Sequence, residues 1–296
     1  METRRLGSTG MQVSVLGFGA SEIGTKATLR AVDRLLNSAL DAGLNLIDSA
    51  ECYGESEELI GGAIGHRLDD YYLLTKCGHA AGLDLPDWSP ALIQGSINRS
   101  LKRLKTDHLD IIQLHSCTEQ ELRHGDLIEV LLRARESGKV RHVGYSGDGA
   151  AALYAVRSGY FDTLQISVNI ADQQALDLIL PDAIERNIGV IAKRPIANVA
   201  WLTWGFLHPY ARPYQQRLRK LRYDFLRQGA GESVGTALRF TLSTPGVHTA
   251  IVGTAKPSRW EQNAALVAKG SLSPPEYERI RARWREIAKP QWTGQN

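Results

Sequence analysis

The amino-acid sequence predicts an α/β fold, a single (β/α)8 TIM barrel that spans residues 1–296. Short segments rich in strand-forming residues alternate with segments whose apolar side chains recur at helical spacing. The glycine-containing connections between them are short, which favours right-handed crossovers between parallel strands. The competing fold is a doubly wound open sheet, and it is disfavoured because no complete Gly-x-Gly-x-x-Gly follows the first strand.

An N-terminal hairpin is expected before the barrel, because strand-forming residues within 4–13 flank a Ser-Thr-Gly turn. Each barrel strand is then a short apolar segment bounded by loop residues. We place the eight strands, in order, at residues 13–18, 45–48, 72–76, 110–115, 140–145, 163–168, 190–193 and 248–253.

Helices are predicted between the strands from the helical spacing of apolar residues and from residues that start or stop a helix. Gly43 suits the position just past a helix, where a residue tolerant of positive φ is needed. Ser89 is an expected N-cap before Pro90. A helix is expected to begin at Pro181, because a proline inside a helix costs about 3 kcal/mol. The other helices are placed at residues 29–40, 56–64, 90–104, 127–138 and 275–288, with one more that ends at residue 159.

A long aromatic-rich loop, residues 196 to about 231, follows the seventh strand and separates it from its helix. Loops longer than about 12 to 15 residues are usually functional or disordered, and aromatic content argues against disorder. We therefore expect this insertion to form a wall of the active site. The alternative is an aromatic patch that packs on the flank of the barrel. The aromatic residues of the insertion include Trp201, Trp204, Phe206, Tyr210, Tyr214 and Tyr223.

Composition narrows the classes of partner. The net charge of +3 is mild and the basic residues are scattered, so nucleic acid is not expected to be a partner. No apolar run is long enough to span a membrane, and the N-terminus lacks the apolar segment of a secretory signal. These features predict a cytoplasmic protein.

The three cysteines are Cys52, Cys77 and Cys117. An odd number in a chain without a secretory signal predicts free thiols. A metal site built from all three is the alternative, but the paired Cys-x-x-Cys spacing common in zinc sites is absent from the sequence. We therefore expect no metal, and we expect alkylation of these thiols to slow turnover if the loops that carry them converge.

Polar residues stand at the ends of consecutive predicted strands. Asp48, Lys76 and His115 end the second, third and fourth strands, and Tyr53 follows the second. In a parallel barrel these ends open on one face, so the four side chains are expected to converge. Lys76 is expected to pair with Asp48 and to lower the pKa of Tyr53 from about 10. Taken alone, Asp48 is equally consistent with a turn or a helix cap, and Tyr53 with a half-buried loop aromatic.

Six segments of the chain together resemble the aldo-keto reductase family, and the resemblance spans essentially the whole length. It implies a barrel that reduces aldehydes or ketones to alcohols by hydride transfer from a nicotinamide cofactor, usually NADPH. The resemblance also implies a small-molecule carbonyl substrate as the partner and a monomer or weak homo-oligomer. By the motif match, Tyr53 is the general acid, Asp48 and Lys76 tune it, and His115 orients the carbonyl group. The matching segments are LGSTG at 6–10, NLIDSAECYG at 45–54, LLTK at 73–76, LKRL at 101–104, DIIQLH at 110–115 and GKVRHVG at 138–144.

The resemblance also implies cofactor contacts, although two positions depart from the family pattern. Gly147 stands where the family often has a carboxamide-binding Asn, and Lys193-Arg194 replaces an aromatic or small polar pair and is expected to contact pyrophosphate instead. Lys256 and Arg259 favour NADPH over NADH, because cations at a helix N-terminus bind a phosphate dianion. The alternative is that both are solvated helix charges. The implied contacts are Gly19, Ala20, Ser146, Gln165, Lys193, Arg194, Pro195, Gly253, Thr254, Lys256, Arg259, Gln262 and Asn263.

The substrate is less clearly indicated than the reaction. Trp88, Trp201 and Trp204 predict an aromatic-walled pocket for apolar or ring-bearing carbonyls, with Trp292 a weaker candidate, although buried indoles that only stabilise the fold are the alternative. A second function is an NADPH-binding regulatory or sensor subunit with little turnover, and the complete set of four polar residues argues for the enzyme. A hydrolase barrel would need His-x-His ligands or paired carboxylates, and neither is evident.

Overall fold

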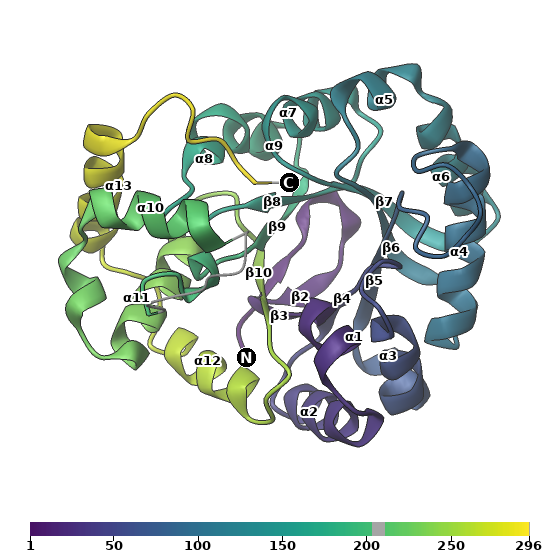
Figure 1. Cartoon of the computed structure of the whole chain (residues 1–296), viewed down its shortest axis with the longest axis horizontal. Helices are drawn as coiled ribbons and strands as arrows, with labels where there is room; N and C mark the ends of the chain where they lie inside the picture. The colour runs from purple at the N-terminus through teal and green to yellow at the C-terminus, as the bar shows by residue number, and fades with distance from the viewer. Residues whose placement is uncertain (203–210, 296) are drawn as a thin grey trace.

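Eight parallel strands close into a barrel in the computed structural model, which describes residues 1–202 and 211–295 (Figure 1). Consecutive strands pair side by side, and the last strand closes the ring by pairing with the first and the seventh. The predicted barrel is therefore confirmed. Its strands are β3 (Leu16–Gly19), β4 (Leu46–Asp48), β5 (Tyr72–Cys77), β6 (Leu109–His115), β7 (Val140–Ser146), β8 (Thr163–Ser167), β9 (Gly189–Lys193) and β10 (Thr249–Gly253).

The predicted N-terminal hairpin is also present. It consists of β1 (Thr3–Arg5) and β2 (Gln12–Ser14), which pair antiparallel. The single strand predicted at residues 13–18 is wrong, because the chain leaves the hairpin after Ser14 and enters the barrel at Leu16. An unbroken apolar run carries no mark of the point where antiparallel pairing gives way to parallel pairing, so the sequence alone did not separate the two strands.

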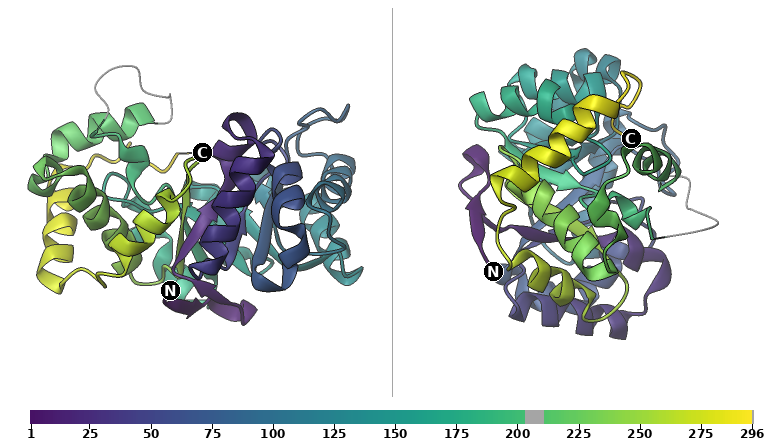
Figure 2. Two further views of the ribbon diagram at one scale, coloured as in Figure 1. Left: turned by 90° about the horizontal axis from the view of Figure 1, so that it is seen from below. Right: turned by 90° about the vertical axis from the view of Figure 1, so that its left-hand side faces the viewer.

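The hairpin closes one end of the barrel. Its buried side chains pack against the interior residues at the starts of the strands, and the view in Figure 2 (left) places this hairpin opposite the C terminus. The opposite end, where the strands finish, is therefore the open one. We call this apolar cluster at the closed end the plug. It consists of Leu6, Met11 and Val13 from the hairpin with Leu46, Leu74, Ile111, Ile191 and Ile251 from the strands.

Most helices that surround the barrel lie where the sequence places them. Ser89 caps its helix by accepting a hydrogen bond from the Leu92 amide, and Gly43 takes a φ of +95° just past the first long helix. Residues 119–136 form two helices, since Gly125 adopts a φ of +83° between them. The helices are α1 (Ile23–Lys26), α2 (Leu29–Asp41), α3 (Ser56–Ile64), α4 (Pro90–Leu104), α5 (Glu119–His124), α6 (Asp126–Glu136), α7 (Gly149–Ser158), α8 (Gln174–Leu178), α9 (Leu180–Glu185), α11 (Ala230–Ser243) and α12 (Arg259–Val267).

The insertion after β9 contains a helix of its own, α10 (Arg212–Leu221), which lies beside α13 (Pro274–Ile287) at the left of Figure 1. Tyr214 and Tyr223 are buried in a second hydrophobic core that also contains Trp292. These aromatic residues therefore pack on the flank of the barrel, as the alternative interpretation holds. Trp204, Phe206 and Tyr210 lie outside the described residues.

A search of the described residues for a membrane-spanning helix found none that combines the necessary length and apolar character.

Candidate active site

Strand alternation brings polar side chains to the open end of the barrel. Asp48, Lys76 and Gln113 each lie two positions beyond an apolar residue of the plug, and side chains two positions apart on a strand point to the same side. The interior of the barrel is therefore apolar where the strands begin and charged where they end. This is the end at which barrels of this kind carry out chemistry.

A buried ion pair lies at the centre of this end. The Nζ of Lys76 lies 2.6 Å from Oδ2 of Asp48 and donates a second hydrogen bond, of 2.7 Å, to the Ser49 carbonyl. The Nε2 of Gln113 donates to the other carboxylate oxygen of Asp48 at 3.0 Å. Lys76 is 0% exposed and Asp48 is 1% exposed. Burial alone would lower the pKa of Lys76, but Asp48 and Tyr53 together raise it, so Lys76 remains an ammonium.

The loop that carries Tyr53 is held by close backbone contacts with α1. The Glu55 amide donates to the Gly24 carbonyl at 3.1 Å, and a Cβ at Gly24 would lie 1.6 Å from the Tyr53 carbonyl oxygen. Only glycine fits at that position. Gly54, which follows Tyr53, has a φ of +58°, a conformation that L side chains rarely adopt. The two glycines therefore determine where the phenol ring lies.

Tyr53 lies beside both Lys76 and His115. The Nζ of Lys76 is 4.9 Å from the centroid of the Tyr53 ring, and the Tyr53 and His115 ring centroids are 5.9 Å apart in an edge-on arrangement. The expected decrease in the pKa of Tyr53 is wrong for the cofactor-free chain. Burial raises this pKa by more than Lys76 lowers it, so the phenol keeps its proton.

His115 is held in its neutral form. Burial lowers its pKa well below the ordinary value, and the nearby cations of Lys76 and Lys193 lower it further. The Nε1 of Trp88 donates to the His115 carbonyl at 3.3 Å, and the His79 ring centroid is 5.0 Å from that of His115. A neutral imidazole can present an N–H to a ligand oxygen without adding charge.

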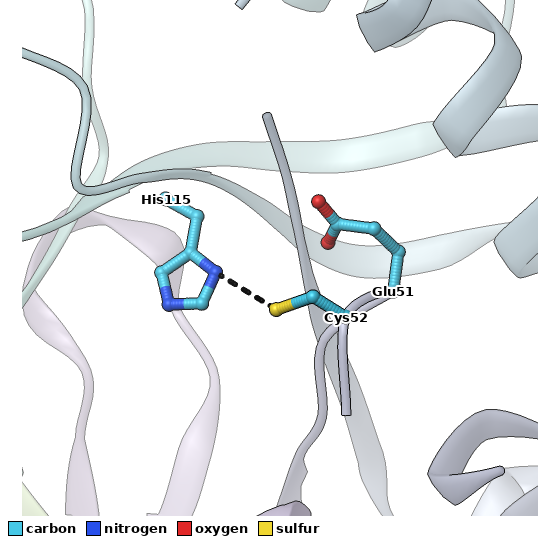
Figure 3. Close-up of side chains that lie close together, drawn as sticks. All are labelled: Glu51, Cys52 and His115. Carbon is cyan, nitrogen blue, oxygen red and sulfur yellow. Dashed lines mark hydrogen bonds between the residues drawn. The ribbon is translucent and has the colours of Figure 1, made fainter. Parts of the chain in front are cut away.

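Glu51, Cys52 and His115 form a cluster beside the ion pair (Figure 3). The Sγ of Cys52 lies 3.6 Å from Nδ1 of His115. Glu51 is 2% exposed; its Oε1 accepts a 2.9 Å hydrogen bond from the His79 amide, whereas its Oε2 has no partner among the described residues. Burial raises the pKa of Glu51 to about 7. The sequence analysis did not single out Glu51, His79 or Gln113.

All three cysteines are free thiols, as expected. Cys52 is partly exposed, whereas Cys77 and Cys117 are buried. The Sγ of Cys77 donates to the Gln113 carbonyl at 3.6 Å, away from the His115 ring contacted by Cys52. Burial raises the pKa of Cys52 to about 12, so it is a protonated thiol at neutral pH.

A donor at the ends of β7 and β8 suits a nicotinamide carboxamide. The Oγ of Ser146 donates to Oε1 of Gln165 at 2.9 Å, and the Nε2 of Gln165 is buried without a partner among the described residues. A carboxamide oxygen would satisfy this donor. Gly147 has no room for a side chain, because a Cβ at that position would lie 2.4 Å from the Tyr145 hydroxyl. The departure from the family pattern at Gly147 therefore has a steric reason.

Lys193 and Arg194 lie on the His115 side of the barrel mouth, since the charges of both help to lower the pKa of His115. The Nζ of Lys193 is 2.9 Å from Oδ2 of Asp148. Arg194 donates to Ser167 at 3.1 Å and also to the Gln295 carbonyl in the C-terminal tail. Pro195, which follows, accepts a 3.1 Å hydrogen bond from a threonine of α11 through its carbonyl.

The expected phosphate-binding residues surround the N-terminus of α12. Lys256 and Arg259 are exposed, and neither side chain makes a hydrogen bond or an ion pair within the described ranges. The other residues implied there differ in exposure: Ala20, Thr254 and Asn263 are buried, Gly19 is half-buried, and Gly253 and Gln262 are exposed. Gly19 and Gly253 end two neighbouring strands.

The three tryptophans implied in the substrate pocket differ in position. Trp88 lies against His79 and His115, with a ring-centroid distance of 4.9 Å to His79. The Nε1 of Trp201 donates to the hydroxyl of Ser233 on α11 at 3.1 Å, so its polar edge faces that helix. Trp204 is outside the described residues. Trp292 is buried in the second hydrophobic core.

Comparison with known proteins agrees with this geometry. The model of the Aldo/keto reductase family matches residues 15–285. L-galactose dehydrogenase from Arabidopsis thaliana is 30% identical over 288 residues, covering 91% of this chain and 89% of that protein. YqkF, an uncharacterized oxidoreductase of Bacillus subtilis (strain 168), is 27% identical over 95% of this chain and 96% of its own length.

A solved structure, the holo form of aldo-keto reductase AKR11C1 from Bacillus halodurans, has a similar fold. The TM-score is 0.83 at 24% sequence identity, and 99% of each chain is covered. The family match covers most of the chain, which therefore belongs to the aldo/keto reductase family. It is an NAD(P)H-dependent oxidoreductase that acts on carbonyl groups.

Proposed function

We propose that this member of the aldo/keto reductase family reduces aldehydes or ketones to alcohols with NADPH, and that Tyr53 is the general acid. The observation that carries the proposal is a protonated phenol beside a buried ammonium, at the end of the barrel where the strands finish. A regulatory or sensor subunit would have no need of this acid.

The nicotinamide cofactor, when bound, supplies the hydride that adds to the carbonyl carbon. Negative charge develops on the carbonyl oxygen, and the phenol of Tyr53 delivers its proton there. Lys76 then faces the phenolate that results and stabilises it. Asp48 holds Lys76 in place, because one of its carboxylate oxygens accepts a hydrogen bond from Lys76 and the other accepts one from Gln113, which orients the carboxylate. Neutral His115 orients the carbonyl group by donating an N–H.

The preference for NADPH rests on Lys256 and Arg259. Both are exposed at the N-terminus of α12, and backbone amides at a helix N-terminus already favour an anion. Their lack of partners within the described ranges leaves both cations available to a 2′-phosphate. NADH carries no 2′-phosphate, so it offers these two cations no anionic group.

Lys193 and Arg194 are proposed to act at the nicotinamide end of the cofactor. Asp148 and Ser167 hold these two cations close to His115, which favours this placement over the pyrophosphate contact expected from the sequence. Ser146 and Gln165 are proposed to bind the carboxamide. Trp88 is proposed as the aromatic wall nearest the reacting atoms, because its indole packs against the backbone of His115.

The experiment follows NADPH oxidation across a panel of aldehydes and ketones. It adds aldoses with NADP⁺, because the name of the Arabidopsis relative indicates a sugar substrate oxidised by that protein. Tyr53→Phe is expected to slow the best reaction by at least about 100-fold, the contribution of a positioned acid. Tyr72→Phe is the matched control, since the hydrogen bond that the Tyr72 hydroxyl makes with the described residues is to the Gln12 amide in the hairpin, at 3.4 Å. A Tyr53→Phe enzyme with the wild-type rate would reject the acid.

Two further outcomes separate the alternatives. Tight NADPH binding without oxidation of any substrate pair would favour the sensor subunit. For cofactor choice, Arg259→Ala is expected to weaken NADPH about 10- to 100-fold, the value of a charge-assisted hydrogen bond, and to leave NADH unchanged. Arg133→Ala, on the exposed face of α6, is the control. Equal weakening of both cofactors would reject the phosphate contact.

A further inference from the structure

We propose that Glu51, Cys52 and His115 form a binding site for a divalent ion of the zinc class, and that occupancy of this site inhibits carbonyl reduction. Glu51 and Cys52 have no part in the proposed reaction. The inhibitory half of the inference rests on the proposed function, whereas binding of the ion does not.

The donor atoms are already gathered. One oxygen of Glu51, the Sγ of Cys52 and one ring nitrogen of His115 all lie within 4.8 Å of one another (Figure 3). Zinc bonds of about 2.0–2.3 Å place the ligand atoms of one tetrahedral ion about 3.3–3.6 Å apart. The distance from Cys52 Sγ to His115 Nδ1 is 3.6 Å. The Glu51 oxygen lies within 4.8 Å of both of these atoms, and its closer approach to them completes three ligands.

The Glu51 carboxylate is an independent reason to expect a ligand. Its Oε2 is buried without a hydrogen-bond partner among the described residues, while the His79 amide holds Oε1 at 2.9 Å. A buried acceptor without a partner costs about 1–3 kcal/mol. Coordination of a cation by Oε2 removes this cost, and the fixed Oε1 orients the carboxylate without occupying the coordinating atom.

The combination of donors selects the class of ion. Thiolate, imidazole and carboxylate together suit zinc and similar borderline ions, whereas magnesium and calcium prefer oxygen alone. Three protein ligands leave a fourth position for water, which the partly exposed Cys52 side chain makes accessible.

The charges also balance. Binding displaces the proton of the Cys52 thiol to solvent, because a coordinated thiol is deprotonated. The thiolate and the Glu51 carboxylate then neutralise the two positive charges of the ion. Lys76, Lys193 and Arg194 are nearby cations that would repel it. The Asp48 carboxylate pairs with Lys76 at 2.6 Å and the Asp148 carboxylate pairs with Lys193 at 2.9 Å, which offsets part of this repulsion.

Inhibition follows from the position of His115. An ion on Nδ1 fixes the ring that is proposed to orient the substrate carbonyl. It also places a new cation beside the Tyr53 ring, whose centroid is 5.9 Å from that of His115. A substrate carbonyl that enters the site would then meet the ion and its bound water rather than the aligned acid.

Binding is tested directly with Co²⁺ and Zn²⁺ on the full-length reduced protein without cofactor. One Co²⁺ per chain is expected, with a thiolate-to-cobalt charge-transfer band that Zn²⁺ abolishes. Cys52→Ser is expected to remove the band and to weaken Zn²⁺ at least about 100-fold, the upper range for loss of a supporting ligand contact. Glu51→Gln is expected to weaken Zn²⁺ while it keeps the band. Cys117→Ser, a buried cysteine outside the cluster, is the control.

The proposal is overturned if no charge-transfer band forms, or if Cys52→Ser binds Zn²⁺ as tightly as the wild type. It is equally overturned if Cys117→Ser alone loses the band. Circular dichroism verifies that each variant is folded. Glu51→Gln keeps the test decisive if a cysteine variant fails to fold.

Inhibition is then measured as NADPH oxidation against Zn²⁺ concentration, with recovery on addition of a chelator. Wild type and Cys117→Ser are expected to lose activity with the same midpoint, and Cys52→Ser to resist at least about 100-fold more Zn²⁺. Active enzyme that binds zinc but keeps its rate would reject the inhibitory role. Zinc binding in a protein that reduces no substrate would instead reject the proposed function and leave the metal site standing.

Discussion

Replacement of Lys76 by Met tests the buried ion pair most directly. The substitution keeps a side chain of similar length but removes the Nζ that lies 2.6 Å from Oδ2 of Asp48. Asp48 is 1% exposed, and among the described side chains it keeps the 3.0 Å hydrogen bond from Gln113. A buried carboxylate is thus left without its counter-charge. The expected loss in the free energy of unfolding is about 3–5 kcal/mol.

The reverse change, Asp48→Asn, strands the ammonium instead and is expected to cost a similar amount. The double variant removes both charges, so its cost should be smaller than the sum of the single costs by about 2–3 kcal/mol. Lys269→Met is the matched control. Its Nζ lies 2.7 Å from Glu232, but both side chains are about half exposed, so its loss should cost at most about 1 kcal/mol.

Urea denaturation at pH 7 measures the four variants and the wild type, and similar slopes show that the unfolded states are comparable. If the double variant loses as much free energy of unfolding as the two single variants combined, the argued coupling between Lys76 and Asp48 is refuted. A Lys76→Met variant no less stable than Lys269→Met would also refute it. Either result would mean that water or a rearranged partner compensates the remaining charge.

Three more predictions follow from burial and close packing. Burial raises the pKa of Asp172 to about 8, above its pKa of about 4 in the unfolded chain. The free energy of unfolding should therefore fall as the pH rises from about 4 to 8, by up to about 6 kcal/mol. Asp172→Asn should flatten the dependence of the urea midpoint on pH. Gly24→Ala forces a Cβ against the Tyr53 carbonyl, so it should lower the free energy of unfolding by about 1–3 kcal/mol and should also lower kcat/KM. An unchanged kcat/KM would show that the loop tolerates displacement. Alkylation should modify the partly exposed Cys52 before the buried cysteines. The loss of turnover should follow the fraction of Cys52 alkylated, as measured by mass spectrometry. Full activity after Cys52 is modified would contradict this prediction.

The polar centre could be located from the sequence because its members mark strand ends. Asp48, Lys76 and His115 each close a short apolar run, and the closed parallel barrel brings such ends to one face. The helix caps at Ser89 and Gly43 were likewise predicted. All of these depend on local pattern, on the repeat of side chains along a strand or helix and on the φ that a residue tolerates.

Contacts between distant residues could not be found in this way. Gln113 binds Asp48 across 65 positions, and nothing in the alternation of its strand distinguishes it from another interior polar residue. Glu51 meets His115 only because the loop after β4 folds towards the end of β6. Within the aromatic insertion, Tyr214 is buried in a second core with residues of α13 rather than at the active site, a contact that the sequence alone did not indicate.

Tertiary packing also decided the protonation states. The sequence correctly placed Lys76 beside Tyr53, and from that neighbour alone a lower pKa of the phenol follows. The pKa is raised instead, because loss of water around the ring outweighs one nearby ammonium. By itself, then, the sequence determined the fold and the polar residues that meet at the strand ends, since these follow from periodic local patterns. The tertiary structure decided their charges and partners, since these depend on how much solvent the folded chain excludes.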